Sequence, residues 1–185
     1  TLGRLRKDGH TALRVSVNLS ARQFREENLA VVVASALMRA ELPPHLLELE
    51  ITESALAQDA GSAMAIAKDL TRMGVILALD DFGTGYSSLS YLRSFPIKCL
   101  KIDKSFVDDI PADPEANALV NAVIAIARSL NLSVVAEGVE TDEQLWYLRE
   151  QKCELIQGYR VSRPLPDGDI DAFLRDNPHY PIFKN

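Results

Sequence analysis

The chain has 185 residues, with 20 Lys and Arg against 26 Asp and Glu, a net charge of -6 and 47% hydrophobic residues. This composition is typical of a folded, acidic domain and excludes a disordered or fibrous protein. An acidic chain without clusters of Lys and Arg is also poorly suited to bind duplex nucleic acid.

The sequence predicts neither a membrane span nor a signal peptide. The apolar runs are far shorter than the roughly 20 residues of a membrane-spanning helix, so we expect no membrane span. The first ten residues lack the apolar core of a signal peptide. Cys99 and Cys153 are far apart and lack CxxC spacing, which favours free thiols and a cytoplasmic location.

Six short apolar segments, each ending in a polar or charged residue, are predicted to be strands. They are Arg14–Asn18, Leu46–Glu50, Val75–Asp80, Cys99–Asp103, Ser133–Glu137 and Glu154–Gln157. Apolar residues at helical spacing predict helices over Glu26–Ala40, Asp59–Met73, Ala116–Leu130, Asp142–Glu150 and Asp169–Arg175. This alternation predicts an α/β fold with a parallel sheet and helices outside it.

The two faces of the predicted strands differ. One face is apolar throughout, whereas the other has smaller residues and becomes polar toward the carboxyl end. That pattern suits a barrel with a site at its carboxyl mouth better than a doubly wound sheet, which is apolar on both faces. We therefore expect a (β/α)8 TIM-type barrel. Such barrels take about 250 residues, so about six of the eight βα units are expected here.

Oxygen donors follow successive predicted strands. Asn18, Glu50, Asp80 and Asp81 offer amide and carboxylate oxygens, the ligands that Mg²⁺ and Mn²⁺ prefer. Parallel strands would bring their ends together at one mouth. The alternative is that these acids only cap loops or helices.

Lys101 and Asp103 share one face of a predicted strand, and Glu137 ends the next. A cation among carboxylates could hold a water or a phosphoryl oxygen, while a carboxylate takes a proton from that water. An internal ion pair that only fills the barrel is the alternative. The segment Asp81–Leu89, DFGTGYSSL, reads as a glycine-containing loop that Glu53 could hydrogen-bond; otherwise Glu53 only favours a helix N-terminus.

Six ordered motifs, which span nearly the whole chain, strongly resemble the EAL-domain family of bacterial cyclic-di-GMP phosphodiesterases. They are VNLSARQF (Val17–Phe24), LELEITES (Leu47–Ser54), LALDDFGTGYSSLSYL (Leu77–Leu92), LKIDKSFV (Leu100–Val107), VVAEGVET (Val134–Thr141) and IQGYRVSRPLP (Ile156–Pro166). The resemblance implies hydrolysis of cyclic di-GMP to linear pGpG in signal transduction. It also implies two Mg²⁺ or Mn²⁺ ions, which are needed because an acidic pocket would repel the dianionic substrate.

Residue roles follow from the same resemblance. Asn18, Glu50, Asp80 and Asp81 match metal ligands, with Asp81 serving the second ion. Lys101 matches the lysine that orients or activates the water, and Glu137 the proposed general base. Glu53 matches the anchor of the mobile DFGTG loop. Further residues match positions in or near the nucleotide pocket: Asp103, Gln157, Glu140, Arg163 and Pro164.

The Glu-Ala-Leu tripeptide that names the family is absent from the sequence. The resemblance implies that the missing segment corresponds to the first two strands of the barrel. We therefore expect one EAL-type domain over residues 1–185 that lacks its N-terminal segment and has impaired turnover. A non-catalytic cyclic-di-GMP receptor is the leading alternative. An enolase-type enzyme with Lys101 as the base and a purely structural or dimerising piece are two others. Family members commonly dimerise and sit beside sensory or GGDEF modules, so a homodimer and such modules in a longer parent protein are the expected partners besides cyclic di-GMP.

Overall fold

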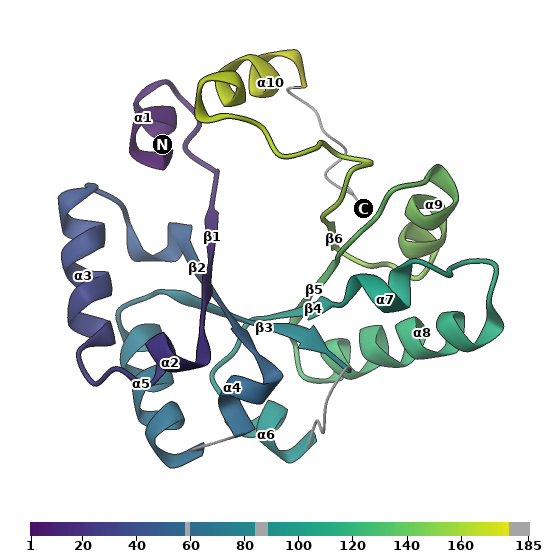
Figure 1. Cartoon of the computed structure of the whole chain (residues 1–185), viewed down its shortest axis with the longest axis horizontal. Coiled ribbons are helices and arrows are strands. Elements are labelled where there is room, and N and C mark those ends of the chain that lie inside the picture. Colours follow the sequence, from purple (N-terminus) through teal and green to yellow (C-terminus); the bar gives the residue numbers. More distant parts are fainter. Residues whose placement is uncertain (58–59, 84–88, 178–185) are drawn as a thin grey trace. The chain divides into compact units, whose positions relative to one another are not determined.

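A computed structural model of the chain describes residues 1–57, 60–83 and 89–177 (Figure 1). The chain forms two compact units, Thr1–Cys99 and Leu100–Asn185. In both units, parallel strands alternate with helices.

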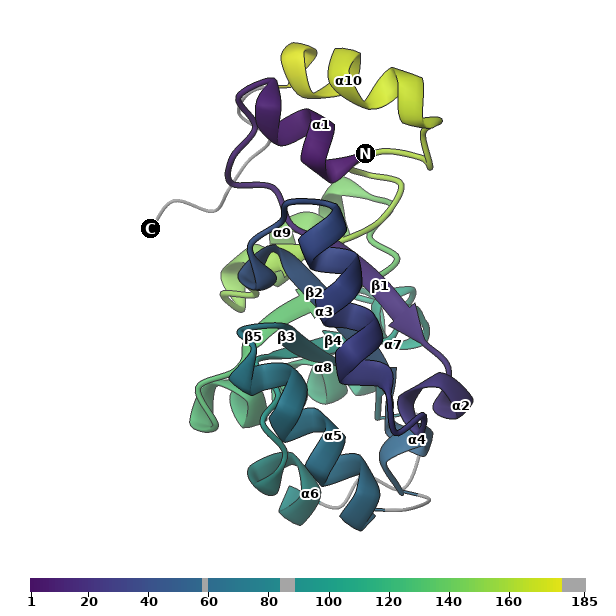
Figure 2. The ribbon, with the colours of Figure 1, turned by 90° about the vertical axis from the view of Figure 1, so that its left-hand side faces the viewer.

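The first unit contains three parallel strands that pair in chain order: β1 (Val15–Leu19), β2 (Leu47–Thr52) and β3 (Ile76–Phe82). Its helices are α1 (Leu2–Lys7), α2 (Ala21–Phe24), α3 (Leu29–Arg39), α4 (Glu53–Ala57), α5 (Ala60–Arg72) and α6 (Leu89–Ser94), with a 3-10 turn, η1 (Pro44–Leu46). Helices α3 and α5 contact each other, and both lie on the same side of the strands (Figures 1 and 2).

The apolar face of β2 and β3 forms the core of the first unit. Leu49, Ile51, Leu77 and Leu79 are at most 2% exposed, as the alternation of side chains predicts for the face beneath the helices. On β1 the same face is less covered, and Val17 is 43% exposed. Among the described strands of this unit, β1 pairs only with β2, so it is the edge strand.

The second unit contains β4 (Cys99–Ile102, whose first residue belongs to the first unit), β5 (Ser133–Ala136) and β6 (Leu155–Ile156). These strands are neighbours in that order, and β5 and β6 pair in parallel. The helices are α7 (Lys104–Val107), α8 (Pro114–Ser129), α9 (Asp142–Glu150) and α10 (Ile170–Asp176), with a 3-10 turn, η2 (Asp167–Asp169). Helix α8 packs against β5 and against α7.

The six predicted strands are confirmed, and their ends differ from the predicted ones by at most two residues. The long helices are also confirmed, and capping explains the earlier start of α8. The side chain of Asp113 accepts a hydrogen bond from Glu115, and Pro114 occupies the first turn of α8, so this helix begins two residues before the predicted Ala116. In contrast, α3 begins only at Leu29, after the N-cap Asn28.

Candidate active site

Polar side chains lie along one face of the three strands of the first unit. Asn18 on β1 is the register partner of Glu50 on β2, which in turn is the partner of Ala78 on β3. Because side chains alternate between the faces of a strand, Asp80, two residues beyond Ala78, lies on this same face. Three of the four predicted metal ligands therefore share one face near the carboxyl ends of neighbouring strands.

These three predicted ligands form a set of hard oxygen donors. Glu50 and Asp80 are buried, whereas Asn18 on the edge strand is exposed. Carboxylates are buried only when hydrogen bonds, opposite charges or a bound cation compensate for the lost hydration. Amide and carboxylate oxygens together suit Mg²⁺ or Mn²⁺ rather than a soft metal. The residues present in this unit thus fit the cation that the sequence predicts.

The fourth predicted metal ligand, Asp81, is half-buried and lies at a kink in β3. Its φ angle is 55°, and its backbone N–H donates to Oδ1 of Asp80 at 3.1 Å. Asp tolerates this left-handed conformation better than most residues. Since the kink interrupts the regular alternation of the strand, the role of Asp81 toward a second ion stays a prediction.

Glu53, the predicted loop anchor, opens α4 directly after β2. Its Oε2 atom is buried and has no hydrogen-bond partner among the described residues. A buried carboxylate oxygen without a partner needs an explanation, and a contact with a residue outside the described ranges would be one. Residues 84–88 of the DFGTG loop lie outside the described residues, so the contact between Glu53 and this loop stays a prediction.

In the second unit, the two predicted catalytic side chains touch. Nζ of Lys101 lies 2.6 Å from Oε1 of Glu137, and the side chains are 3% and 16% exposed. Lys101 belongs to β4, and Glu137 directly follows β5, where its backbone N–H donates to the carbonyl of Ile102 at 3.0 Å. An ionised carboxylate can accept a proton from water, and an ammonium group can donate hydrogen bonds to water or to a phosphoryl oxygen. The pair therefore contains the two kinds of group that the predicted water-activating site requires.

Two of the predicted pocket residues follow strands of the second unit. Asp103 is the N-cap of α7, where its Oδ1 accepts hydrogen bonds from the backbone N–H and the hydroxyl of Ser105. Helix capping, the alternative considered for acids after strands, is thus one observed role of Asp103. Gln157 follows β6 with an exposed side chain, and its backbone N–H donates to Ala136 at 2.8 Å.

Glu140 is an exposed pocket candidate that pairs with a lysine. Its Oε1 lies 2.6 Å from Nζ of Lys104. This hydrogen bond is the main cause that raises the pKa of Lys104 above its ordinary value of 10.5. Contact with substrate would have to compete with, or include, this ion pair.

The last two pocket candidates lie in the segment after β6. The guanidinium carbon of Arg163 lies 4.5 Å from the ring centroid of Tyr159, within cation–π range. Both side chains, and Pro164, are exposed. The structure therefore leaves Arg163 and Pro164 accessible, and their contact with nucleotide stays a prediction.

Two buried polar residues were not singled out from the sequence. Glu48 lies on the same face as Glu50, and its Oε1 accepts a hydrogen bond from Ser16 at 3.0 Å. Gln144 in α9 is 5% exposed and completes a capping box with Thr141. Thr followed three residues later by Gln is the sequence signature of that box, so this residue was within reach of sequence analysis.

The chain is similar in sequence to known proteins. The EAL domain family matches residues 1–164. The cyclic di-GMP phosphodiesterase NbdA of Pseudomonas aeruginosa is 49% identical over 167 residues, which are 90% of this chain and 21% of NbdA. MucR of the same organism, a bifunctional diguanylate cyclase/cyclic di-GMP phosphodiesterase, is 45% identical over 158 residues, 85% of this chain and 23% of MucR. The chain thus spans about a fifth of the length of these curated relatives.

Solved structures agree with these matches. The MucR phosphodiesterase in complex with c-di-GMP superimposes with a TM-score of 0.88 at 42% identity, over 91% of this chain and 68% of that one. Klebsiella pneumoniae BlrP1, in a complex with manganese and cyclic di-GMP, gives a TM-score of 0.79 at 32% identity, over 88% of this chain and 41% of that one.

Two further findings concern the helices and the fold. None of the described helices is long and apolar enough to span a membrane. The structural matches confirm the predicted α/β fold of TIM-barrel type with six parallel strands. By its sequence motifs, its fold and its match over residues 1–164, the chain belongs to the EAL-domain family.

Proposed function

We propose that this chain hydrolyses cyclic di-GMP to linear pGpG in a reaction that depends on Mg²⁺ or Mn²⁺, with impaired turnover because the sequence lacks the Glu-Ala-Leu tripeptide. The observation that carries the proposal is the buried contact between Lys101 and Glu137 at 2.6 Å, in a member of a family whose named relatives are cyclic di-GMP phosphodiesterases.

The proposed metal ligands are Asn18, Glu50, Asp80 and Asp81, and two ions are proposed. Their support is the shared face of the first three residues and the manganese present in the BlrP1 complex. When bound, a divalent cation would supply polarisation of a phosphoryl oxygen and a lowered pKa of water. The ligand residues would hold it by their charge and their amide and carboxylate oxygens, which their strands place on one face.

The proposed roles of Lys101 and Glu137 concern the attacking water. Glu137 accepts a proton from the water as its oxygen attacks phosphorus, and the bond from phosphorus to the 3′ oxygen breaks. The leaving 3′ oxygen takes a proton from solvent, so the product carries one 5′ phosphate and one 3′ hydroxyl. Lys101 orients the water and holds the carboxylate of Glu137 in place by their 2.6 Å contact.

The proposal also covers the substrate contacts, the location and the partners of the chain. Five further residues are proposed to contact or border the substrate: Asp103, Gln157, Glu140, Arg163 and Pro164. We place the site of action in the cytoplasm, where the free cysteines Cys99 and Cys153 stay reduced. A homodimer and sensory or GGDEF modules are proposed as partners, and a relative that is a bifunctional cyclase and phosphodiesterase supports the second of these.

Product chromatography and isothermal titration on one sample test the proposal. The protein is used in molar excess over cyclic di-GMP with Mn²⁺, so that even slow hydrolysis gives measurable pGpG. We expect pGpG from the wild type and none from Glu137→Gln, which removes the base but keeps the size of the side chain. Tight binding without any pGpG from the wild type would overturn the proposed hydrolysis and favour the receptor.

A further inference from the structure

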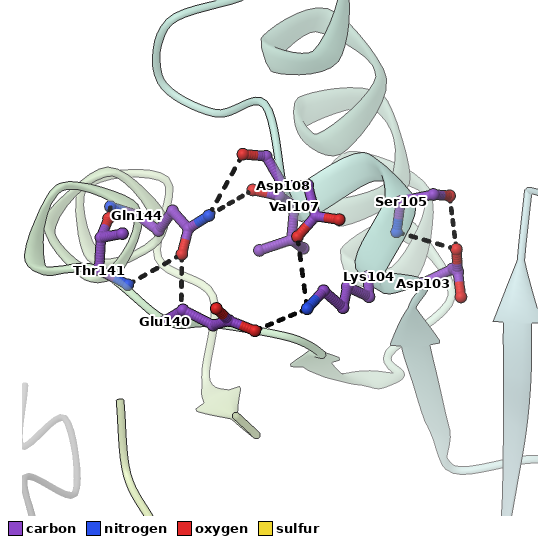
Figure 3. A network of polar contacts seen from close by, with 8 residues as sticks. All are labelled: Asp103, Lys104, Ser105, Val107, Asp108, Glu140, Thr141 and Gln144. Carbon is purple, nitrogen blue, oxygen red and sulfur yellow. Dashed lines mark hydrogen bonds and ion pairs between the residues drawn. The ribbon is translucent and has the colours of Figure 1, made fainter. Parts of the chain in front are cut away.

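The buried side chain of Gln144 connects the segments that follow the two catalytic residues (Figure 3). Its Oε1 accepts hydrogen bonds from the backbone N–H groups of Glu140 and Thr141 at 2.8 and 3.0 Å. Its Nε2 donates to the carbonyl of Val107 at 3.0 Å. A single amide group, 5% exposed, therefore links the loop after β5 to the end of α7.

The loop that Gln144 holds is the one that starts with Glu137. Residues 137–141 run from the end of β5 to the N-cap of α9. Gly138 has a φ of 72°, and a Cβ atom there would lie 2.3 Å from Cγ of Lys104. The backbone of the loop thus rests directly on the aliphatic part of the Lys104 side chain.

The next residue of the loop is packed equally closely. Val139 is fully buried, and its backbone N–H donates to the carbonyl of Gln157 at 3.1 Å. A Cβ atom on Gly158 would lie 2.2 Å from the carbonyl oxygen of Val139. Contacts therefore fix this loop at each residue from Glu137 to Thr141, and Gln144 supplies the last two of them.

The partner segment starts from the other catalytic residue. Lys101 lies on β4, and α7 begins at Lys104, immediately after the capping residue Asp103. The hydrogen bond from Gln144 to Val107 at the end of α7 therefore ties the loop of Glu137 to the short segment anchored by β4. Since Lys101 and Glu137 must keep a 2.6 Å contact, their two supporting segments must keep a fixed separation.

We propose that Gln144 is a positioning residue for the Lys101–Glu137 pair. The inference rests on the proposed function, because the pair is given its catalytic role there. Gln144 acts through the backbone of the loop and touches neither the substrate nor the reacting atoms. Its amide is suited to this task because it offers an acceptor to the loop and a donor to α7 at the same time.

The neighbouring ion pair provides a contrast. Lys104 and Glu140 also join α7 to the loop at 2.6 Å, but their side chains are 49% and 42% exposed. Exposed ion pairs hold their partners only weakly. The backbone hydrogen bond from Glu137 to Ile102 holds the start of the loop against β4, and we assign the link between its later residues and α7 to Gln144 rather than to this ion pair.

The test compares three substitutions in the intact chain. Gln144→Met keeps the volume but removes the acceptor and the donor, whereas Gln144→Glu keeps the acceptor for the two loop amides and loses the donor to Val107. Asp113→Ala removes the N-cap of α8 and serves as a control that lowers stability without touching the loop.

The readouts are single-turnover hydrolysis of cyclic di-GMP with protein in excess and hydrogen exchange of residues 137–141. For Gln144→Met we expect the maximal rate constant to fall about 10- to 100-fold, because a misplaced catalytic group slows the reaction by this order. The protein concentration that gives half of the maximal rate constant should change less than threefold. Gln144→Glu should lie between Met and the wild type, and Asp113→Ala should keep the wild-type rate constant. Exchange should rise in residues 137–141 of Gln144→Met and stay unchanged there in Asp113→Ala.

The possible results separate the two proposals. A rate constant for Gln144→Met within threefold of the wild type would overturn the positioning role, and so would unchanged exchange in residues 137–141. If the wild type forms no pGpG at all, the proposed function fails. In that case hydrogen exchange alone tests whether Gln144 orders the loop, and unchanged exchange of residues 137–141 in Gln144→Met overturns that role.

Discussion

The contact between Lys101 and Glu137 makes a quantitative prediction for stability. Their charged atoms are 2.6 Å apart and the side chains are 3% and 16% exposed, so their attraction at an effective dielectric constant near 20 is about 6 kcal/mol. Loss of hydration offsets part of this attraction, and removal of one partner of a buried pair typically costs about 3–5 kcal/mol. We expect Lys101→Met and Glu137→Gln each to lower the free energy of unfolding by this amount.

A double-mutant cycle separates the pair from other effects of each substitution. The double variant loses the interaction only once. Its loss of unfolding free energy should therefore be about 2–3 kcal/mol smaller than the sum of the two single losses. Urea unfolding followed by circular dichroism gives the four free energies. The matched control is the cycle of Lys104→Met and Glu140→Gln, whose side chains are also 2.6 Å apart but 49% and 42% exposed, and its coupling should be close to zero. A coupling energy for the buried pair no larger than for this exposed pair would refute the reasoning.

Three other predictions follow from single sites. Asp80→Asn should weaken Mn²⁺ binding at least tenfold in isothermal titration, because it removes a charged oxygen donor; affinity equal to the wild type would contradict its role as a ligand. Glu53→Ala should lower the rate of pGpG formation while the bound metal, measured by atomic absorption, stays unchanged; a parallel loss of metal would instead place Glu53 among the ligands. Burial raises the pKa of Cys153 from its ordinary value of 9.0 to about 11. The folded state then keeps a proton that the unfolded state loses, so this contribution to stability is complete below pH 9 and is lost as the pH rises to 11. The loss is at most about 3 kcal/mol, and Cys153→Ala should flatten the measured dependence of the free energy of unfolding on pH.

The strands and the long helices could be predicted because each carries its own periodic signal. The apolar face of β2 and β3 reads directly from alternation along the sequence, and Leu77 is fully buried as that pattern requires. The short helices α2, α4 and α7 have only four or five residues each. One turn of helix is too short to show a 3.6-residue period, so they were not predicted.

For the candidate site, residue type and strand position were enough to predict which face Asn18, Glu50 and Asp80 occupy. The contact between Lys101 and Glu137 was also open to prediction, because both residues lie near the polar carboxyl ends of consecutive predicted strands. The use of Asp103 as a helix cap and the pairing of Glu140 with Lys104 depend on loop geometry. Side-chain hydrogen bonds between elements far apart in sequence, such as that from Gln144 in α9 to Val107 in α7, leave no periodic trace.

The central claim is that the carboxylate of Glu137 takes a proton from the water that cleaves cyclic di-GMP. Its most direct test is the comparison of the wild type with Glu137→Gln in one experiment that records cyclic di-GMP binding by titration and pGpG by chromatography, both with Mn²⁺. We expect the two proteins to bind cyclic di-GMP equally well and the wild type alone to form pGpG. Equal rates of pGpG formation by the two proteins would contradict it.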